Sequence, residues 1–230
     1  MKSIGDRIKE NYENRARYEL TRRIPVIIRI DGRAFHTFTR GMNRPFDQKL
    51  IDTMVESARV VANSIQGCKA AYVQSDEASF LVTDYDTLQT DAWFGYNKSK
   101  VESISSSIMT ASFNRIMSIG TDAYFDSRSF NVPREEVSNY FLWRALDWER
   151  NSLTMYAGSF FSHKQLHGMN SADKHEMLHE IGKNWTTDLT SQQRNGTFII
   201  SGEVRTDILP TYEQIDSVLS NLVYCDKGKI

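Results

Sequence analysis

The sequence predicts an α+β protein whose first half follows the ferredoxin-like βαββαβ order, with a mostly helical extension after it. Three observations support this fold class. Short runs rich in β-branched and apolar residues are bounded by turn residues, as is typical of buried strands. Two longer segments repeat apolar residues every three or four positions, as amphipathic helices do. From residue 24 to residue 132 these segments alternate as strand, helix, strand, strand, helix, strand.

The first strand is expected at about residues 24 to 30, and it ends directly before Asp31. A helix is expected from Phe46 to Gln66, where Gly67 supplies a stop signal. The apolar residues of this helix fall on one face: Leu50, Ile51, Met54, Val55, Ala58, Val61, Ala62 and Ile65. The helix therefore has one side to bury against a sheet.

Two short strands are expected next, at about residues 70 to 74 and 78 to 83. The polar residues Ser75, Asp76 and Glu77 separate them. Because so few residues connect the two strands, the pair is predicted to form a β-hairpin whose turn carries both acids.

The second helix is expected to begin at a capping box formed by Ser99 and Glu102 and to end at Gly120. Its apolar face consists of Val101, Ile104, Ile108, Ala111 and Ile116. The segment from Tyr124 to Val132 is predicted as the last strand of the βαββαβ unit, although polar residues interrupt its apolar pattern.

Connection rules for such a sheet predict where the acids lie. A right-handed crossover makes the first two strands parallel, so the first strand ends at the edge where the hairpin turns. Asp31 and the pair Asp76-Glu77 are therefore expected at one edge. Such carboxylates can hold one or two divalent cations, about 3.5 to 4 Å apart if there are two. The alternative interpretation is that each acid is a solvated turn residue.

The residues after Asp31 are suited to bind phosphate. Gly32 allows backbone to approach a ligand closely, and the exposed amides of residues 32 to 36 precede a helix, which favours anions. Arg44 stands near the start of the first long helix, where it can meet a triphosphate. Metal ions and an arginine together would neutralise the negative charge of a phosphate. This combination indicates an enzyme that transfers a phosphate-containing group.

Composition limits the classes of protein that fit. The chain has 230 residues, 40% of them hydrophobic and 25% charged, which is typical of one large or two small globular domains. A formal net charge of −1 means that any nucleic acid must bind through local patches, such as the arginines at 15, 17, 22 and 23. Cys68 and Cys225 have no metal-site or disulfide spacing, and no segment has the roughly 20 apolar residues of a membrane span. A cytoplasmic location is expected.

Two segments carry a resemblance to a known family. Residues 29 to 38, Arg-Ile-Asp-Gly-Arg-Ala-Phe-His-Thr-Phe, and residues 74 to 80, Gln-Ser-Asp-Glu-Ala-Ser-Phe, resemble the signature segments of the tRNA-histidine guanylyltransferase family. Looser similarity continues through Trp93-Phe94, Ser99-Lys100, Tyr124 to Arg128, and Trp143 to Asp147. The resemblance implies a polymerase-type palm that adds nucleotides in the 3′-5′ direction to the 5′ end of tRNA, as a homotetramer.

The resemblance also implies a domain division and roles for individual residues. Residues 1 to 132 would form the palm, and residues 133 to 230 would supply RNA contacts and oligomerisation. Asp31, the Gly32 carbonyl and Asp76 resemble the ligands of two Mg²⁺ ions, with Glu77 as a neighbouring catalytic acid. ATP and GTP would be substrates, bound by Arg29, Arg33, Ala34, Phe35, His36, Arg44, Ser75 and Lys100.

The chain departs from the family pattern at two places. Arg44 stands where a lysine is usual, which keeps the charge but changes its hydrogen-bond geometry. After Asp147, the eukaryotic His-Ile-Asn-Asn motif is replaced by residues that include Glu149, Arg150 and Asn151, which we expect to contact RNA. This version resembles the guanylyltransferase-like branch, which repairs truncated tRNA 5′ ends by templated addition.

Three alternative functions have some support in the sequence. The segment His175-Glu176-Met177-Leu178-His179 matches a zinc-protease pattern, but Trp185 stands where the longer pattern needs a third histidine. A noncatalytic RNA-binding module shares the βαββαβ order, but the strands lack its aromatic base-stacking platform. A palm-type nucleotidyl cyclase would also use acids at strand ends, and dependence on RNA distinguishes it from the transferase.

Overall fold

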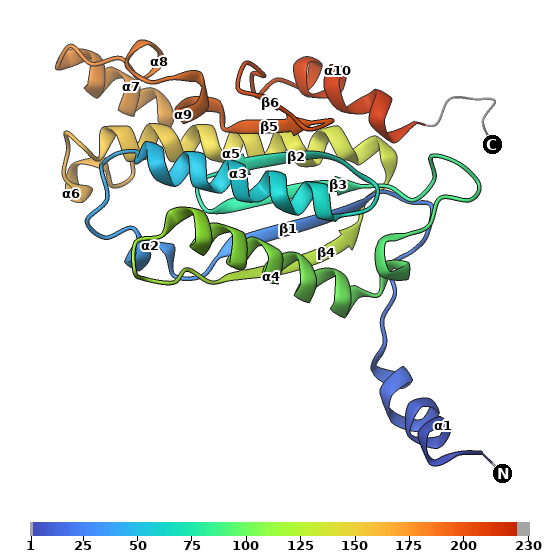
Figure 1. Ribbon diagram of the computed structural model, residues 1–230. Coiled ribbons are helices and arrows are strands. Elements are labelled where there is room, and N and C mark those ends of the chain that lie inside the picture. The colour runs from blue at the N-terminus through green and yellow to red at the C-terminus, as the bar shows by residue number, and fades with distance from the viewer. Residues whose placement is uncertain (1, 225–230) are drawn as a thin grey trace.

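The computed structural model of the chain describes residues 2 to 224 and confirms the predicted βαββαβ core (Figure 1). One sheet has six strands in the order β4-β1-β3-β2-β5-β6, and every neighbouring pair is antiparallel. The strands are β1 Val26–Gly32, β2 Cys68–Gln74, β3 Glu77–Val82, β4 Phe125–Asn131, β5 Thr197–Ile200 and β6 Glu203–Arg205. As the crossover rule predicts, β3 lies beside β1 and the first two strands run in the same direction.

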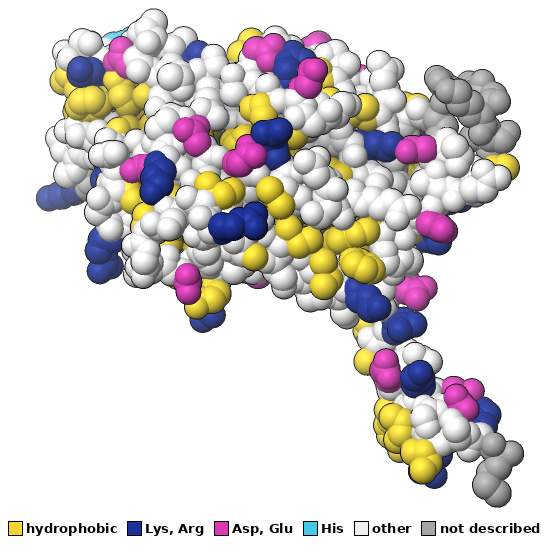
Figure 2. Space-filling model, viewed as in Figure 1, with side chains coloured by type: hydrophobic (Ala, Val, Ile, Leu, Met, Phe, Trp, Pro, Cys, Tyr) yellow, Lys and Arg dark blue, Asp and Glu magenta, His cyan; other side chains and the backbone are white. Residues whose placement is uncertain are grey.

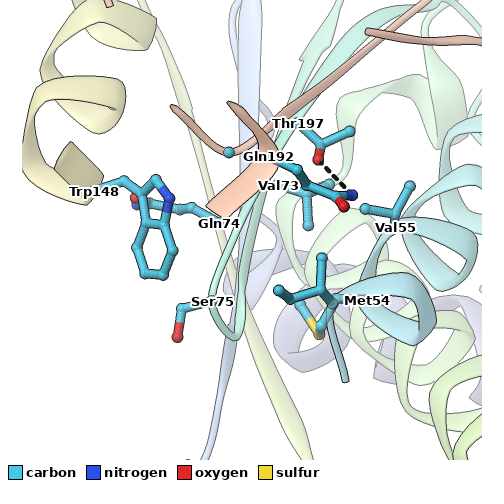
Figure 3. Close-up of a pocket in the computed structure, with 10 residues that line it drawn as sticks. Met54, Val55, Val73, Gln74, Ser75, Trp148, Gln192 and Thr197 are labelled. Atoms are coloured by element: carbon cyan, nitrogen blue, oxygen red, sulfur yellow. Dashed lines mark hydrogen bonds between the residues drawn. The ribbon is translucent and has the colours of Figure 1, made fainter. Parts of the chain in front are cut away.

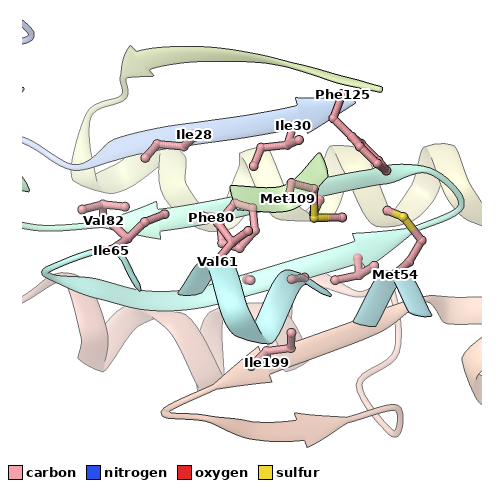
Figure 4. Packing of buried hydrophobic residues seen from close by; sticks show 14 of the residues in the cluster. Ile28, Ile30, Met54, Val61, Ile65, Phe80, Val82, Met109, Phe125 and Ile199 are labelled. Carbon is pink, nitrogen blue, oxygen red and sulfur yellow. The ribbon is translucent and has the colours of Figure 1, made fainter. Parts of the chain in front are cut away.

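Helices cover both faces of the sheet. On one face α3 (Gln48–Ser64) and α4 (Lys98–Met117) enclose a core that includes Ile28, Phe80 and Met109, seen in Figure 4. On the other face α5 (Val137–Ala157) and α10 (Tyr212–Val223) pack on residues of the opposite strand parity, among them Ile27 and Leu81. Strands β1 and β3 are therefore buried on both sides over most of their length, which explains their nearly continuous hydrophobic sequence.

Shorter helical elements connect and extend these layers. They are α1 Ile4–Ile8, the π-helix η1 Lys9–Glu13, the 3₁₀ turns η2 Asn14–Ala16, η3 Trp93–Tyr96 and η4 Arg134–Glu136, and the helices α2 Phe35–Phe38, α6 His163–Leu166, α7 Ser171–Glu180, α8 Trp185–Asp188 and α9 Ser191–Asn195. A third, smaller core joins the end of α5 to α7 and α8. Among the described residues, no helix combines the length and the apolar character that crossing a bilayer requires.

The predicted ends of the second helix were wrong. Helix α4 begins after Asn97, whose side chain accepts from the amide of Lys100, so Ser99 and Glu102 form no capping box. The Glu102 carboxylate instead accepts from the amide and hydroxyl of Ser129 on β4, at 2.7 and 3.0 Å. The helix ends at Met117, before Ser118 in a left-handed conformation, rather than at Gly120.

The predicted hairpin exists, but its turn is shorter than expected. Glu77 is the first residue of β3 and pairs with Gln74, so only Ser75 and Asp76 form the turn. Ser75 has a positive φ of 47°, as a tight hairpin turn requires. The correction matters because Glu77 points to the α5 face as a strand residue instead of facing solvent in a turn.

The residues after 132 are mostly helical, and they also add strands to the sheet. Strand β5 pairs with β2 from Ala70↔Ile200 to Val73↔Thr197, and β6 follows it as an edge strand. The Tyr72 hydroxyl fixes this junction by donating to the backbone carbonyl of Asn195 at 2.8 Å. Cys68 is a free thiol in β2, and Cys225 lies outside the described residues.

Candidate active site at the carboxylate end of the sheet

The structure brings the acids of the first strand and of the hairpin to one edge of the sheet. Asp31 is in register with Glu77 across the β1–β3 pair. The amide of Gly32 donates to the backbone carbonyl of Asp76 at 3.0 Å, which ties the end of β1 to the hairpin turn. This edge, with Asp31, Asp76 and Glu77, is called the carboxylate end below.

A cleft of about 370 Å³ opens at the carboxylate end, with Asp31 and Asp76 among its lining residues. Its opposite wall is α5, which contributes Arg144, Trp148 and Asn151. Sequence reasoning did not identify Trp148 as a site residue. The spacing of Arg144, Trp148 and Asn151 could have identified it, because residues that are three or four positions apart lie on the same face of a helix.

A smaller cavity of about 20 Å³ adjoins this cleft and shares Trp148 and Ser75 with it (Figure 3). In Figure 3 the indole of Trp148 stands above Ser75, and Met54 of α3 lies across from it. Phe46, just before α3, packs edge-on against Trp148 with ring centroids 6.1 Å apart. These contacts join the loop before α3 to the α5 wall of the cleft.

The pKa of Asp76 is raised above that of an ordinary aspartate. Burial is the main cause, and the negative charges of Asp31 and Glu77 add to it, while a hydrogen bond from Ser75 acts in the opposite direction. The two cleft carboxylates therefore repel each other at neutral pH. A bound cation would relieve this repulsion.

The loop after Asp31 is shaped by a glycine and held by aromatic packing. A Cβ atom at Gly32 would lie 2.2 Å from the Phe35 ring and 2.9 Å from the Asp76 Cβ, so no larger residue fits. Ala34 has a positive φ of 54°, which turns the chain into α2. Phe35 is buried against Phe113 and Phe125, with ring centroids 5.6 and 5.1 Å away.

This anchoring leaves backbone donors free at the surface. Within the described chain, the amides of Ala34, Phe35 and His36 have no acceptor, whereas the next two amides bond to the Ala34 carbonyl. Free amides in such a loop can bind phosphate oxygens. The side chains of Arg33 and His36 are exposed beside them.

Glu77 differs from the other two acids because its charge is already neutralised. Arg144 holds both carboxylate oxygens, with Nε to Oε1 at 2.7 Å and the second nitrogen to Oε2 at 2.8 Å. Both side chains are about nine-tenths buried. Arg144 also contacts Asp147 at 3.3 Å and stacks over the Trp143 ring at 4.5 Å. Glu77 therefore fastens the start of β3 to α5.

Arg29 lies on the same face of the sheet as Asp31 and Glu77. Its Nε is 3.9 Å from a Glu77 oxygen, and within the described residues this buried nitrogen has no hydrogen-bond partner. Buried donors in proteins normally have acceptors. Arg29 is therefore a group beside Glu77 with unused hydrogen-bonding capacity.

The donor atoms at the carboxylate end fit a hard divalent cation. Asp31 and Asp76 offer carboxylate oxygens, and Gly32 adds a backbone carbonyl beside them. Among the described residues, no cluster of three or more His, Cys, Asp or Glu side chains is arranged to hold a metal. The protein alone thus supplies few ligands, as is common where waters and substrate phosphates complete the shell of Mg²⁺.

Other residues predicted for the site lie at different places. Arg44 is exposed in the loop that Phe46 joins to Trp148. The structure does not bring Lys100 to the carboxylates: it lies in the first turn of α4, at the opposite end of the sheet, 5.9 Å from the Phe94 ring centroid. On α5, Asn151 lines the cleft and exposed Arg150 pairs with Asp147 at 3.0 Å, whereas Glu149 is half-buried.

The zinc-protease pattern lies on α7, and neither of its histidines lines the cleft. The ring of His175 packs edge-on against Trp185 at 5.8 Å. Burial lowers the pKa of His175, and nearby His179 lowers it further. Because Trp185 is a buried core residue and no third metal-binding side chain joins the pair within the described chain, the helix does not offer a zinc site.

Comparison with known proteins gives a consistent answer. The family model described as tRNAHis guanylyltransferase matches residues 5 to 133. A probable tRNA(His) guanylyltransferase of Drosophila melanogaster is 28% identical over 84% of this chain and 74% of its own length. The tRNA(His) guanylyltransferase of Schizosaccharomyces pombe is 30% identical over 74% of this chain and 72% of its own.

Solved structures are similar as well. A bacterial tRNA(His) guanylyltransferase-like protein in complex with ATP has a TM-score of 0.91 and 42% identity over 96% of this chain and all of its own. One in complex with GTP has a TM-score of 0.86 and 39% identity over 97% of this chain and all of its own. The Saccharomyces cerevisiae enzyme, with 23% identity and a TM-score of 0.73 over 85% of this chain and 94% of its own, shares the fold.

Proposed function

The chain belongs to the tRNAHis guanylyltransferase family, and on this premise we propose that its carboxylate end adds nucleotides in the 3′-5′ direction to the 5′ end of tRNA. It is a nucleotidyltransferase. ATP and GTP are the proposed nucleotide substrates, since similar proteins were solved with each of them. Mg²⁺ is the proposed cofactor, and a homotetramer in the cytoplasm is the expected working form.

One observation carries the proposal: Asp31 and Asp76 line one cleft, and the loop that directly follows Asp31 has backbone amides without acceptors among the described residues. Carboxylates alone would repel a triphosphate, and amides alone would bind it without activating it. When bound, divalent cations neutralise the triphosphate and make the attacking oxygen more nucleophilic. Asp31, Asp76 and the Gly32 carbonyl are the groups that would hold them.

The remaining residues position the reactants. The amides of Ala34 to His36 are suited to bind the triphosphate of a nucleotide, because they have no acceptor within the described chain. Arg29, with an unpaired Nε, and Arg44 are suited to phosphate oxygens. A 5′-monophosphorylated RNA would first be activated by a nucleoside triphosphate. The 3′-hydroxyl of the incoming nucleotide would then attack the activated phosphorus and release the activating group.

Residues of α5 on the wall of the cleft support the proposal that RNA is the substrate. Arg150 is exposed and Asn151 lines the cleft, so both can reach an RNA end that enters toward the carboxylates. This segment lacks the eukaryotic His-Ile-Asn-Asn motif. The bacterial guanylyltransferase-like structures also share more identity with this chain than the fly and fission yeast relatives do. We therefore favour templated repair of truncated tRNA over addition to tRNA-histidine alone.

The test is extension of 5′-labelled, 5′-truncated tRNA with Mg²⁺ and each nucleoside triphosphate. Wild type should add the templated nucleotides, and Asp76→Ala should lose at least about 10³-fold in rate, since each tenfold loss is only about 1.4 kcal/mol of transition-state stabilisation. Asp91→Ala is the matched control, because its side chain is 86% exposed and does not line the cleft. Equal extension by wild type and Asp76→Ala would refute the proposed site. Nucleotide cyclisation without RNA would favour a cyclase.

A further inference from the structure

Asp147 of α5 is the centre of a group of side chains that joins the buried part of the helix surface to its exposed part. One carboxylate oxygen accepts from an Arg150 nitrogen at 3.0 Å. The other lies 3.3 Å from an Arg144 nitrogen and 3.5 Å from the amide nitrogen of Asn151, at the long limit of a hydrogen bond. Arg144 precedes Asp147 by three positions, and Arg150 and Asn151 follow it by three and four. All four side chains therefore lie on one side of the helix.

Asp147 is itself held by a buried arginine. The Arg144 guanidinium is fixed by its two hydrogen bonds to Glu77. Only 9% of the Arg144 side chain is exposed, compared with 30% for Asp147 and 62% for Arg150. The order of the buried ion pair therefore extends through Asp147 to the exposed side chains beyond it.

The position of Asp147 differs from that of its neighbours. Arg144 and Asn151 line the cleft, whereas Asp147 does not. A substrate in the cleft would meet Asn151 directly and Asp147 only through it. A carboxylate would also repel a phosphate, but here the charge of Asp147 is neutralised by two arginines. The residue is therefore suited to position other groups and not to contact RNA itself.

The chain has little excess positive charge with which to hold RNA. Its formal net charge is −1, and on the face seen in Figure 2 the described basic and acidic side chains are interspersed. Proteins that bind nucleic acid mainly by charge concentrate positive residues on one face. With so little excess charge, recognition depends more on side chains that are already held in the right position.

A side chain that is held before RNA arrives loses less entropy on binding. An unrestrained surface arginine has many rotamers, and ordering it at an interface opposes association. Asp147 restrains Arg150 and also Asn151, which lines the cleft. An ordered guanidinium is suited to a phosphate. The Asn151 amide both donates and accepts, so it is suited to a base edge or a ribose hydroxyl.

We propose that Asp147 is a positioning residue for the RNA substrate: it holds Arg150 and Asn151 in the arrangement that receives the 5′ end of the RNA. It also ties that arrangement to the Glu77–Arg144 ion pair. This inference rests on the proposed function, because it assumes that the cleft receives RNA. Asp147 acts through its two neighbours and not on the reacting atoms.

A mutant cycle on kcat/KM for extension of 5′-truncated tRNA tests the proposal. In the wild-type background, Asp147→Ala should lower kcat/KM about tenfold, mainly through a higher KM for tRNA, because two side chains lose their order. In an Arg150→Ala/Asn151→Ala background the same change should alter kcat/KM less than about twofold, because the residues through which Asp147 acts are gone. An equal loss in both backgrounds, or no loss in the wild-type background, would overturn the proposal.

Two further variants accompany the cycle. Asp147→Asn keeps the size of the side chain and removes its charge, so it should also lower kcat/KM, and it replaces Asp147→Ala if that variant folds poorly. Asp52 is an exposed aspartate of α3 that accepts a hydrogen bond from Gln48, and Asp52→Ala should leave kcat/KM unchanged. A urea-unfolding midpoint of Asp147→Ala as low as that of Arg144→Ala would show a structural role and overturn the proposal.

Binding measured without catalysis separates this inference from the proposed reaction. Fluorescence anisotropy with labelled, 5′-truncated tRNA should give a Kd that Asp147→Ala raises in the wild-type background only. Loss of a negative charge would by itself tighten RNA binding, so weaker binding is specific to lost positioning. Wild type that binds tRNA without extending it would refute the proposed reaction, and an unchanged Kd of Asp147→Ala would still overturn this inference. Wild type that binds no tRNA would overturn both.

Discussion

The two ends of the sheet differ in how their side chains are held. At the carboxylate end, strand register places Asp31 beside Glu77, an ion pair holds Glu77 on Arg144, and aromatic packing holds the loop after Asp31 through Phe35. At the other end, the N-terminal helical segment from Ile4 to Ala16 leaves the body of the protein. Backbone hydrogen bonds of Tyr18 and Leu20 attach the chain just after it, and its apolar side chains Ile4, Ile8 and Tyr12 are exposed. The comparison teaches that contacts between distant segments order the cleft, whereas the N-terminal helical segment is held only by hydrogen bonds among its own residues within the described chain.

Removal of Arg144 is the strongest way to break this comparison. Arg144→Ala would remove the bidentate partner of the buried Glu77 charge, with Arg29 still 3.9 Å away, and should cost about 3 to 5 kcal/mol in the free energy of unfolding. Urea unfolding followed by circular dichroism measures this cost. Arg150→Ala is the matched control on the same helix, because its side chain is 62% exposed and its ion pair with Asp147 should contribute less than about 1 kcal/mol.

The double variant Glu77→Gln/Arg144→Met sharpens this prediction. It removes both charges together and should recover most of the stability that Arg144→Ala loses. Activity should nevertheless stay low, since the hairpin turn that carries Asp76 would lose its tie to α5. If Arg144→Ala unfolds like wild type, Glu77 does not fasten the hairpin and its proposed positioning role fails.

The second test compares a glycine at the carboxylate end with a glycine in the N-terminal helical segment. Gly32→Ala should cost about 1 to 3 kcal/mol in the free energy of unfolding, because the new methyl overlaps the Phe35 ring and forces the phosphate-binding loop to move. The KM for nucleoside triphosphate should rise with it. Gly5→Ala, in α1, meets only the Ser3 hydroxyl at 3.7 Å and should be neutral or slightly stabilising, as alanine favours helix.

These two variants are compared by thermal unfolding and by steady-state kinetics on truncated tRNA. Equal effects at Gly32 and Gly5 would show that the loop after β1 adapts as freely as the N-terminal helical segment. That outcome would contradict the rigid carboxylate end described above.

The smallest expected effect concerns the raised pKa of Asp76. A carboxyl whose pKa is higher in the folded than in the unfolded protein binds its proton more tightly when folded, so its ionisation at neutral pH reduces stability. Asp76→Asn should therefore raise the melting temperature of metal-free protein at pH 7, by a few degrees at most. The difference between the variant and wild type should shrink as the pH falls through the raised pKa of Asp76.

Differential scanning calorimetry in the presence of a chelator at neutral and at mildly acidic pH measures this difference. Asp91→Asn serves as the control, because its carboxylate is largely exposed. A melting temperature of Asp76→Asn below that of wild type at pH 7 would mean that burial and the nearby negative charges do not destabilise ionised Asp76 in the folded protein.

Much of the core was predictable because local patterns and topology rules agreed. The β-branched strand before Asp31 and the hairpin at Asp76 are predicted from the sequence. The right-handed crossover between the first two strands then places Asp31 and Asp76 at one edge of the sheet. The capping box at Ser99 and Glu102 was predicted wrongly for a physical reason. Glu102 finds two donors on Ser129, 27 positions away, and that tertiary contact outweighs the local cap.

The role of Glu77 was equally invisible to local reasoning. Because Glu77 is adjacent to Asp76, the sequence predicts that it is another acid of the metal site. In the structure, Arg144, which is 67 positions away in the sequence, donates hydrogen bonds to both of its carboxylate oxygens. Trp148 and the β5–β2 pairing depend in the same way on segments that are distant in sequence.

By itself, the sequence determined the strands, the two long helices and the shared edge of Asp31 and Asp76, because periodicity and chain connectivity are local or follow general rules of handedness. The tertiary structure alone decided which charges stay free and which apolar faces stay uncovered. A charge is free only if no partner reaches it, and a face is uncovered only if no element packs on it. Both conditions depend on the whole arrangement in space.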